Sequence, residues 1–362
     1  MAVQFGFDSI FRFIFTTFFT NRRFSRMNKL IVFALVITLF SACGNNNVPD
    51  VSNIKVDVRI SRFEKDFFAV DTIHIMEAMN SVQQKYPWFF NDYIQNIVIG
   101  GNPDTSLQLP AILSQYLRNA RPLYDSVAKK FVSLDNLDKE LKQGFQYVTH
   151  YFPKYPVPKV VTYVGLIGDP SIALTPNALA VGLQMYLGRN FSAYNTLEAI
   201  DKFPQYISRR FEPQYISTNC FQNIAQDIYP DKTQGLSLIE QMIEKGKQWW
   251  LTDKFLPLAA DTLKTGFTGS QLTWCRDNEG LIWNFILQNN DIYTTDPPVI
   301  QNFIGEAPKT DGMPDASPGN VGQWIGWQIV KSFAEKNGKL SVDEVLKMEP
   351  KKLFEEAKYK PK

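Results

Sequence analysis

The sequence is poor in the residues that most often bind metal ions. Its 362 residues include two histidines, His74 and His150, and three cysteines. The histidines are 76 positions apart, so they cannot form the short histidine pair of a zinc peptidase helix. Three cysteines are too few for a thiolate zinc cluster or a disulfide scaffold. We therefore expect no metal and no cofactor.

A strong charge of one sign is also lacking. The net charge is +2 and no long basic run occurs, which gives no electrostatic basis for binding nucleic acid. Long apolar runs are scarce as well. The run Leu30–Phe40 has eleven residues, whereas a transmembrane helix needs about twenty and the core of a signal peptide about 7–15.

The surroundings of this run predict a lipoprotein signal. Basic residues between positions 22 and 29 precede it, and the small pair Ser41-Ala42 follows, directly before Cys43. This layout predicts cleavage between Ala42 and Cys43, with a diacylglycerol and an N-acyl chain such as palmitate attached to Cys43. An ordinary secretory signal, or a buried helix with a chance cysteine, is the alternative.

Removal of residues 1–42 changes the charge of the chain. Residues 1–42 carry +4, so the mature chain carries −2. We place the true start of the leader at Met27. Attraction to anionic lipid therefore does not anchor the chain, and the acyl chains must do so. Residues 43–54 read as a polar tether, and residues 55–362 as a single folded envelope domain.

The folded body is predicted to be α+β, mainly helical around a small mid-chain sheet. Alternation over Val56–Ile60 predicts a strand, and Lys159–Ile167 gives the best strand pattern, with a second apolar stretch at Ile172–Leu187. Apolar residues spaced by three or four predict a helix over Leu134–Phe152. Helices are also predicted around 209–228 and 236–251, and Leu272 to Ile286 forms another apolar stripe.

No set of side chains stands out as catalytic. Glu240 and Glu244 are one helical turn apart and read as a solvated charged face. Glu279 falls near an apolar stripe, where an ion pair with Arg276 or a more distant arginine would explain it. His150 reads as a packed histidine. We expect no catalytic residue among them.

Three further features have structural explanations. Gly319, Gly322 and Gly326 predict a helix that approaches a neighbour closely, flanked by Trp324 and Trp327. The abundant tryptophans would suggest glycan binding if they were exposed, and core packing otherwise. Cys220 and Cys275 could form a disulfide in an oxidising compartment, or remain two buried thiols.

Several long strings resemble the GldB-type gliding-motility lipoproteins of the Bacteroidota. They are VGLQMYLG (181–188), PQYISRRFEPQYI (204–216), QLTWCRDNEGLIWNFI (271–286), SPGNVGQWIGWQIVKSF (317–333) and KYKP (358–361). The resemblance implies a lipid-anchored protein of the cell envelope, facing the periplasm. It also implies protein–protein contacts with gliding or type IX secretion components.

This family is also similar to predicted zinc peptidases with an HExxH motif, which implies a degenerate zincin-like fold. The metal helix would fall at RRFEPQYISTNCFQNI (209–224), which has no histidine, and Lys245-Gly246 stands where those peptidases have Glu-Gly. We therefore expect a non-enzymatic protein. The rival hypotheses are a periplasmic hydrolase of peptide or peptidoglycan that uses Glu279, and a glycan-binding module with exposed tryptophans.

Overall fold

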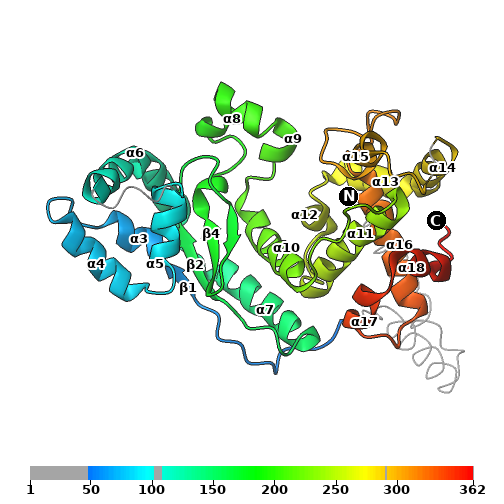
Figure 1. The fold of residues 1–362 in the computed structure, drawn as a ribbon, viewed down its shortest axis with the longest axis horizontal. Helices are drawn as coiled ribbons and strands as arrows, with labels where there is room; N and C mark the ends of the chain where they lie inside the picture. The colour runs from blue at the N-terminus through cyan, green and yellow to red at the C-terminus, as the bar shows by residue number, and fades with distance from the viewer. Residues whose placement is uncertain (1–47, 102–107, 290–291, 362) are drawn as a thin grey trace, which may run out of the picture. The chain divides into compact units, whose positions relative to one another are not determined.

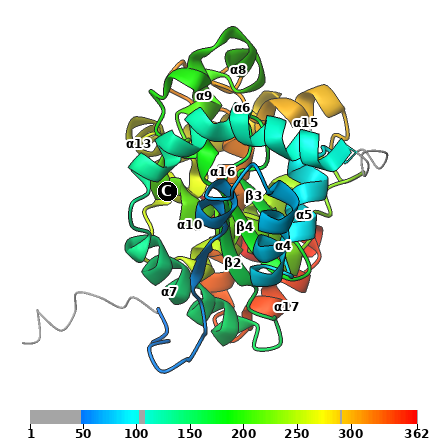
Figure 2. The same ribbon diagram turned by 90° about the vertical axis from the view of Figure 1, so that its left-hand side faces the viewer.

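The computed structural model describes residues 48–101, 108–289 and 292–361. The chain divides into two compact units, Met1–Asp50 and Val51–Lys362, and the fold below is that of the second unit (Figures 1 and 2). The predicted cleavage site at Ala42 and Cys43 lies outside the described residues.

The chain is attached to the body of this unit before its first strand begins. Val51 is 4% exposed, and the side-chain amide of Gln146 donates a hydrogen bond of 2.9 Å to the carbonyl oxygen of Ile54. Gln146 belongs to α7 (Asp135–Tyr151). The part of the predicted tether from Val51 onward is therefore packed on the body.

Four short strands form one mixed sheet in the order β1-β2-β4-β3. They are β1 (Ile60–Arg62), β2 (Lys159–Tyr163), β3 (Ile172–Leu174) and β4 (Ala178–Gly182). β2 pairs in parallel with β1 and β4, whereas β3 pairs antiparallel with β4 and forms one edge. Val160 to Tyr163 are at most 1% exposed, because both faces of β2 are covered.

The strand predicted over Val56–Ile60 is displaced. Its alternating pattern is present, and Val58 is buried, but pairing with β2 begins only at Ile60. The alternation reflects packing of an extended segment rather than a hydrogen-bonded ladder. The predicted α+β class, mainly helical around a small mid-chain sheet, is confirmed.

Helices from the first part of the unit lie together beside β1 and β2 (Figure 1). They are α3 (Phe63–Phe68), α4 (Ile75–Lys85), α5 (Phe90–Tyr93), the π-helix η1 (Ile94–Val98) and α6 (Leu109–Lys130). Aromatic rings join them to the sheet. The Phe63 ring centroid lies 4.8 Å from that of Tyr93, which lies 5.8 Å from that of Tyr163 on β2. Such pairs contribute about 1 kcal/mol each beyond simple burial.

The later helices form the rest of the unit. Helix α7 confirms the stripe predicted over Leu134–Phe152, since Leu141, Phe145 and Val148 are fully buried. Next to it lie α10 (Ile216–Ile228) and α11 (Leu238–Phe255). The ring of Phe221 on α10 packs 5.1 Å from that of Phe145. These contacts hold α10 against the sheet side of the molecule.

Helix α11 crosses α16 (Val321–Lys336) with the two backbones in contact. A Cβ atom added to Gly326 would lie 1.7 Å from the carbonyl oxygen of Met242, and one added to Gly246 would lie 2.2 Å from the carbonyl carbon of Gly326. Only glycine fits at either position. The predicted close approach of this helix is confirmed, and Trp327, 1% exposed, packs beside the crossing.

Short elements complete the unit. They are η3 (Leu183–Met185), η4 (Ser192–Asn195), α8 (Leu197–Lys202), α9 (Gln205–Ser208), η5 (Pro213–Tyr215), α12 (Asp261–Thr265), α13 (Gly269–Asp277), α14 (Glu279–Asn289), α15 (Pro297–Ile304), α17 (Val342–Lys347) and α18 (Pro350–Ala357). The stripe predicted from Leu272 to Ile286 is two helices, which are separated at Asn278. None of the helices in the described ranges is long and apolar enough to cross a bilayer.

Candidate functional site

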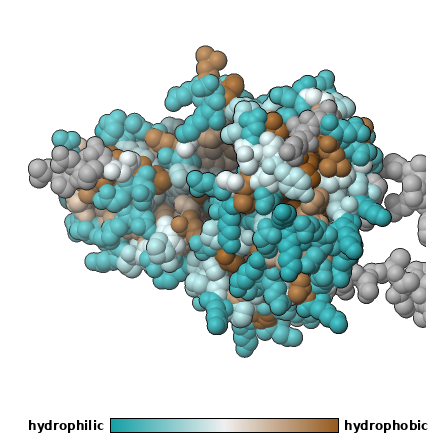
Figure 3. All heavy atoms as spheres, turned by 45° about the vertical axis from the view of Figure 1, so that its right-hand side comes forward, coloured by the Kyte–Doolittle hydropathy of each residue, from teal (hydrophilic) through white to brown (hydrophobic). Residues whose placement is uncertain are grey.

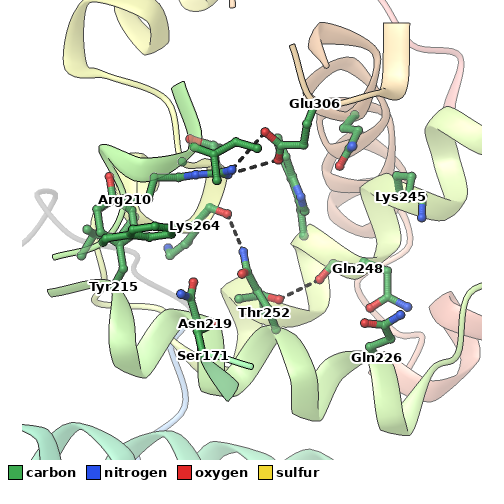
Figure 4. Close-up of a pocket in the computed structure, with 18 of the residues that line it drawn as sticks. Ser171, Arg210, Tyr215, Asn219, Gln226, Lys245, Gln248, Thr252, Lys264 and Glu306 are labelled. Carbon is green, nitrogen blue, oxygen red and sulfur yellow. Dashed lines mark hydrogen bonds and ion pairs between the residues drawn. The ribbon is translucent and has the colours of Figure 1, made fainter. Parts of the chain in front are cut away.

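A cavity of about 380 Å³ lies between α10 and α11, and its wall also includes Arg210, residues 263–266 and Glu306 (Figure 4). Its volume falls in the range of small-ligand pockets, roughly 300–1,000 Å³. Figure 3 shows a hollow near the middle of one face of the molecule, bordered by hydrophilic and hydrophobic side chains alike.

Helix α10 turns a polar face toward this cavity. Asn219, Gln222 and Gln226 follow one another by three and four positions, so they share one side of the helix. The opposite side carries Cys220 and Ile224, which are fully buried. The helix is thus anchored by its apolar side and presents amides on its open side.

Four carboxamides of the wall are held in place by the protein. We call the space that they line the amide cavity. Asn219 donates to the hydroxyl of Tyr186 at 2.8 Å, and Gln222 to the carbonyl oxygen of Lys264 at 3.0 Å. Gln248 donates to the carbonyl oxygen of Tyr229. Gln323 donates to that of Ile304 at 2.5 Å.

Each of these amides uses its NH₂ group to bind the protein. Among the described residues, no donor reaches the side-chain oxygen of Asn219, Gln222, Gln248 or Gln323. These oxygens are therefore free to accept hydrogen bonds from a ligand.

Two ion pairs neutralise charged side chains at the cavity wall. Arg210 binds Glu306 through two hydrogen bonds of 3.1 Å each. Lys264, only 2% exposed, lies 2.5 Å from Asp253. Because each cation has its own carboxylate, the wall has little net charge to offer a ligand.

A third pair, Lys245 with Asp231, lies at the same wall. Partial burial raises the pKa of Asp231. Hydrogen bonds from Lys245 and Thr233 outweigh that effect and lower the pKa to about 2. Burial also raises the pKa of the Tyr186 hydroxyl. At neutral pH the first group is therefore an anion and the second a neutral hydroxyl.

The residues weighed for a hydrolase lie elsewhere. Glu279 is 9% exposed, and the hydroxyl of Tyr359 donates to it at 2.5 Å. Arg276 pairs instead with Asp261 at 2.7 Å, so the predicted partner of Glu279 was wrong. Glu279 does not line the amide cavity.

Glu240 and Glu244 do not form the solvated face that their spacing suggested. Glu240 closes the capping box of α11 with Ser237. Glu244 is 4% exposed and lies 2.7 Å from the buried Lys247, and Tyr229 donates to it at 2.7 Å. The prediction failed because this side of α11 packs against the segment between α17 and α18. There Lys247 donates to the carbonyl oxygen of Met348 at 2.6 Å.

Cys220 and Cys275 are free thiols in the structure, and both are buried. Burial raises the pKa of Cys275 to about 12 and that of Cys220 further, which makes both unreactive. Of the two alternatives left by the sequence, the structure therefore has two buried thiols rather than a disulfide.

The tryptophans weighed for glycan binding are buried. Trp324 is 2% exposed, Trp327 1% and Trp250 4%, so these indole rings cannot form a binding platform at the surface. The prediction that His150 is packed was wrong: it lies at the surface, against the ring of Tyr151. Across the described ranges, no group of three or more His, Cys, Asp or Glu side chains could hold a metal ion.

The sequence reasoning missed the amide cavity. Polar residues at Asn219, Gln222 and Gln226 within an apolar helix were a usable signal, because amides on one face of a packed helix need partners. The wall contributed by Lys264 and Glu306 carried no such signal, since only the tertiary fold brings these positions together.

The site is thus a polar pocket on an α+β body. A family model described as "Gliding motility protein GldB" matches residues 44–361. The chain belongs to this family, and so to a lipoprotein family of the cell envelope that takes part in gliding motility. No curated protein and no solved structure matches the chain.

Proposed function

We propose that the mature chain is a non-catalytic lipoprotein, anchored through Cys43 and facing the periplasm. It works by binding other polypeptides of the gliding or type IX secretion machinery, and the amide cavity is where it does so. The observation that carries this function is the wall of anchored amides and paired charges. Those groups offer many hydrogen bonds and no poised acid or base.

The wider setting agrees with this proposal. The family places the chain in the envelope and in motility, and a mature charge of −2 leaves anchoring to the acyl chains. The degenerate zincin-like shape stays a prediction. It would explain why a cleft persists beside α10 when the helix has no histidine.

A cavity-filling variant tests the proposal. Gln226 is exposed at the cavity mouth and forms no hydrogen bond within the described chain, so Gln226→Arg obstructs the cavity while leaving the fold intact. We expect it to abolish most gliding in cells that lack the native gene. Gln143→Arg on α7 is the matched control, since Gln143 is also an exposed helical glutamine but lies outside the cavity.

A turnover assay separates the proposal from its hydrolase rival. The purified full chain is incubated with casein peptides and with peptidoglycan fragments. We expect no product with either, and normal gliding with Glu279→Gln. Product formation that disappears in Glu279→Gln would overturn the non-catalytic function.

A further inference from the structure

Strand β3 has one edge that is unpaired. Two hydrogen bonds of 2.8 Å flank its ladder, from Gly182 to Ser171 and from Thr175 to Ala178. By antiparallel alternation Ala173 bonds to β4, and the N–H and C=O groups of Ile172 and Leu174 point away from the sheet. Within the described chain, those groups have no hydrogen-bond partner.

This edge connects two hollows. Ser171, just before β3, lines the amide cavity. Leu174 at its other end lines a second hollow of about 520 Å³, together with Tyr155 and Asp227. Tyr155 donates to Asp227 at 2.7 Å, which fixes that wall. A free strand edge thus runs from one hollow to the other.

We propose that an extended polypeptide segment adds to β3 as a further strand and places a neutral polar side chain in the amide cavity. The inference rests on the proposed function, because it names the kind of contact through which the chain binds its partners.

The chemistry of the edge favours a polypeptide over other ligands. Donors and acceptors that alternate about 6.6–7 Å apart, at Ile172 and Leu174, match the backbone of another extended chain. Unpaired strand edges are ready templates for such pairing. The free amide oxygens of Asn219 and Gln222, beside paired charges, suit an uncharged hydrogen-bonding side chain such as Asn, Gln, Ser or Thr.

The test starts from peptides selected for binding. A display library of random decapeptides is selected against the full chain in detergent, and the selected peptides are measured with variants of Leu174. Leu174→Pro removes an outward N–H that the fold does not use, and proline is tolerated at such edge positions. Leu174→Ala keeps the N–H and is the matched control.

We expect Leu174→Pro to weaken binding at least tenfold and Leu174→Ala to change it less than threefold. Hydrogen exchange of the Ile172 and Leu174 amides should slow when the peptide is bound. Peptides methylated at alternate backbone nitrogens test the same bonds without altering the protein, so the result stands even if Leu174→Pro fails to fold. They should lose binding in one register of methylation and keep it in the other.

The outcomes separate the two proposals. Some peptides could bind without being cleaved, with an affinity that neither Leu174→Pro nor backbone methylation changes. That result would overturn strand addition and leave the proposed function standing. Peptides that are cleaved would overturn the non-catalytic function instead. If the library yields no binder, or if chitotetraose binds the cavity and no peptide does, both proposals fall.

Discussion

At the scale of single residues, the least expected feature is a fully buried lysine. Lys247 is 1% exposed at its side chain and donates to Glu244 and to the carbonyl oxygen of Met348. Burial lowers the pKa of Lys247, and the charge of Glu244 opposes that effect. The lysine therefore joins the middle of α11 to the turn before α18 by donating to a buried carboxylate and to a partly buried carbonyl oxygen.

Removing this lysine alone should be costly. Lys247→Met keeps most of the side-chain volume but leaves the Glu244 carboxylate buried without a cation, so we expect a loss of about 3–5 kcal/mol in the free energy of unfolding. Lys245→Met is the control two positions away, because its pair with Asp231 is partly exposed and should contribute less than about 1 kcal/mol.

The measurement is urea unfolding of the full chain in detergent. Adding Glu244→Gln to Lys247→Met removes the stranded charge and should recover most of the loss. If the double variant is no more stable than Lys247→Met, the buried charge is not the cause and the lost contact with Met348 is.

At the scale of elements, the α11–α16 crossing is the tightest helix packing that we describe. Met242 lies against Gly326, and Gly246 against the same turn of α16. Contact between backbones leaves no room for side chains to adjust. Because α11 also carries Gln248 of the amide cavity, the crossing fixes one wall of that cavity.

A single methyl group at the crossing tests this point. Gly326→Ala would force the helices apart, and we expect it to destabilise the chain by about 3 kcal/mol. Gly280→Ala on α14 is the matched control, because no atom lies within 4 Å of the added Cβ and alanine favours helix by up to about 1 kcal/mol. Thermal unfolding of both variants should show opposite signs, and equal destabilisation would contradict the packing explanation.

Some elements could be predicted from local sequence patterns and others could not. Helix α7 and the glycines of α16 were predictable because local periodicity and residue size determine them. Strand β1 was misplaced and Glu244 was assigned to solvent, because in both cases distant segments decide the outcome. The start of β1 is set by its pairing with β2. The burial of Glu244 depends on its contacts with Lys247 and Tyr229. The amide cavity is lined by residues from many separated parts of the chain, from Ser171 to Gln323, and no local pattern predicts that they meet.

At the scale of the whole molecule, the family match gives the setting: the chain belongs to a lipoprotein family of the cell envelope. No helix in the described part of the chain spans a membrane, and the family is one of lipoproteins. The predicted lipid on Cys43 would then be the attachment to the membrane.

Cys43→Ala should release the chain from the membrane. We expect most of the protein to move from the membrane fraction to the soluble fraction on cell fractionation, and incorporation of an alkyne-labelled fatty acid to be lost, because acyl chains supply about 0.8 kcal/mol per buried methylene. Retention in membranes together with normal gliding would refute the anchoring assignment.

The attachment of Val51 and Ile54 has a mechanical consequence. If the chain were pulled through an anchor at Cys43, the sheet would not be the first part of the fold to bear the force. It would be borne by the buried side chain of Val51 and by the bond from Gln146 of α7 to Ile54. Traction would thus pass into α7, and through the contact of Phe145 with Phe221 into α10. The helix that presents the amides would lie directly on the path of force between membrane and partner.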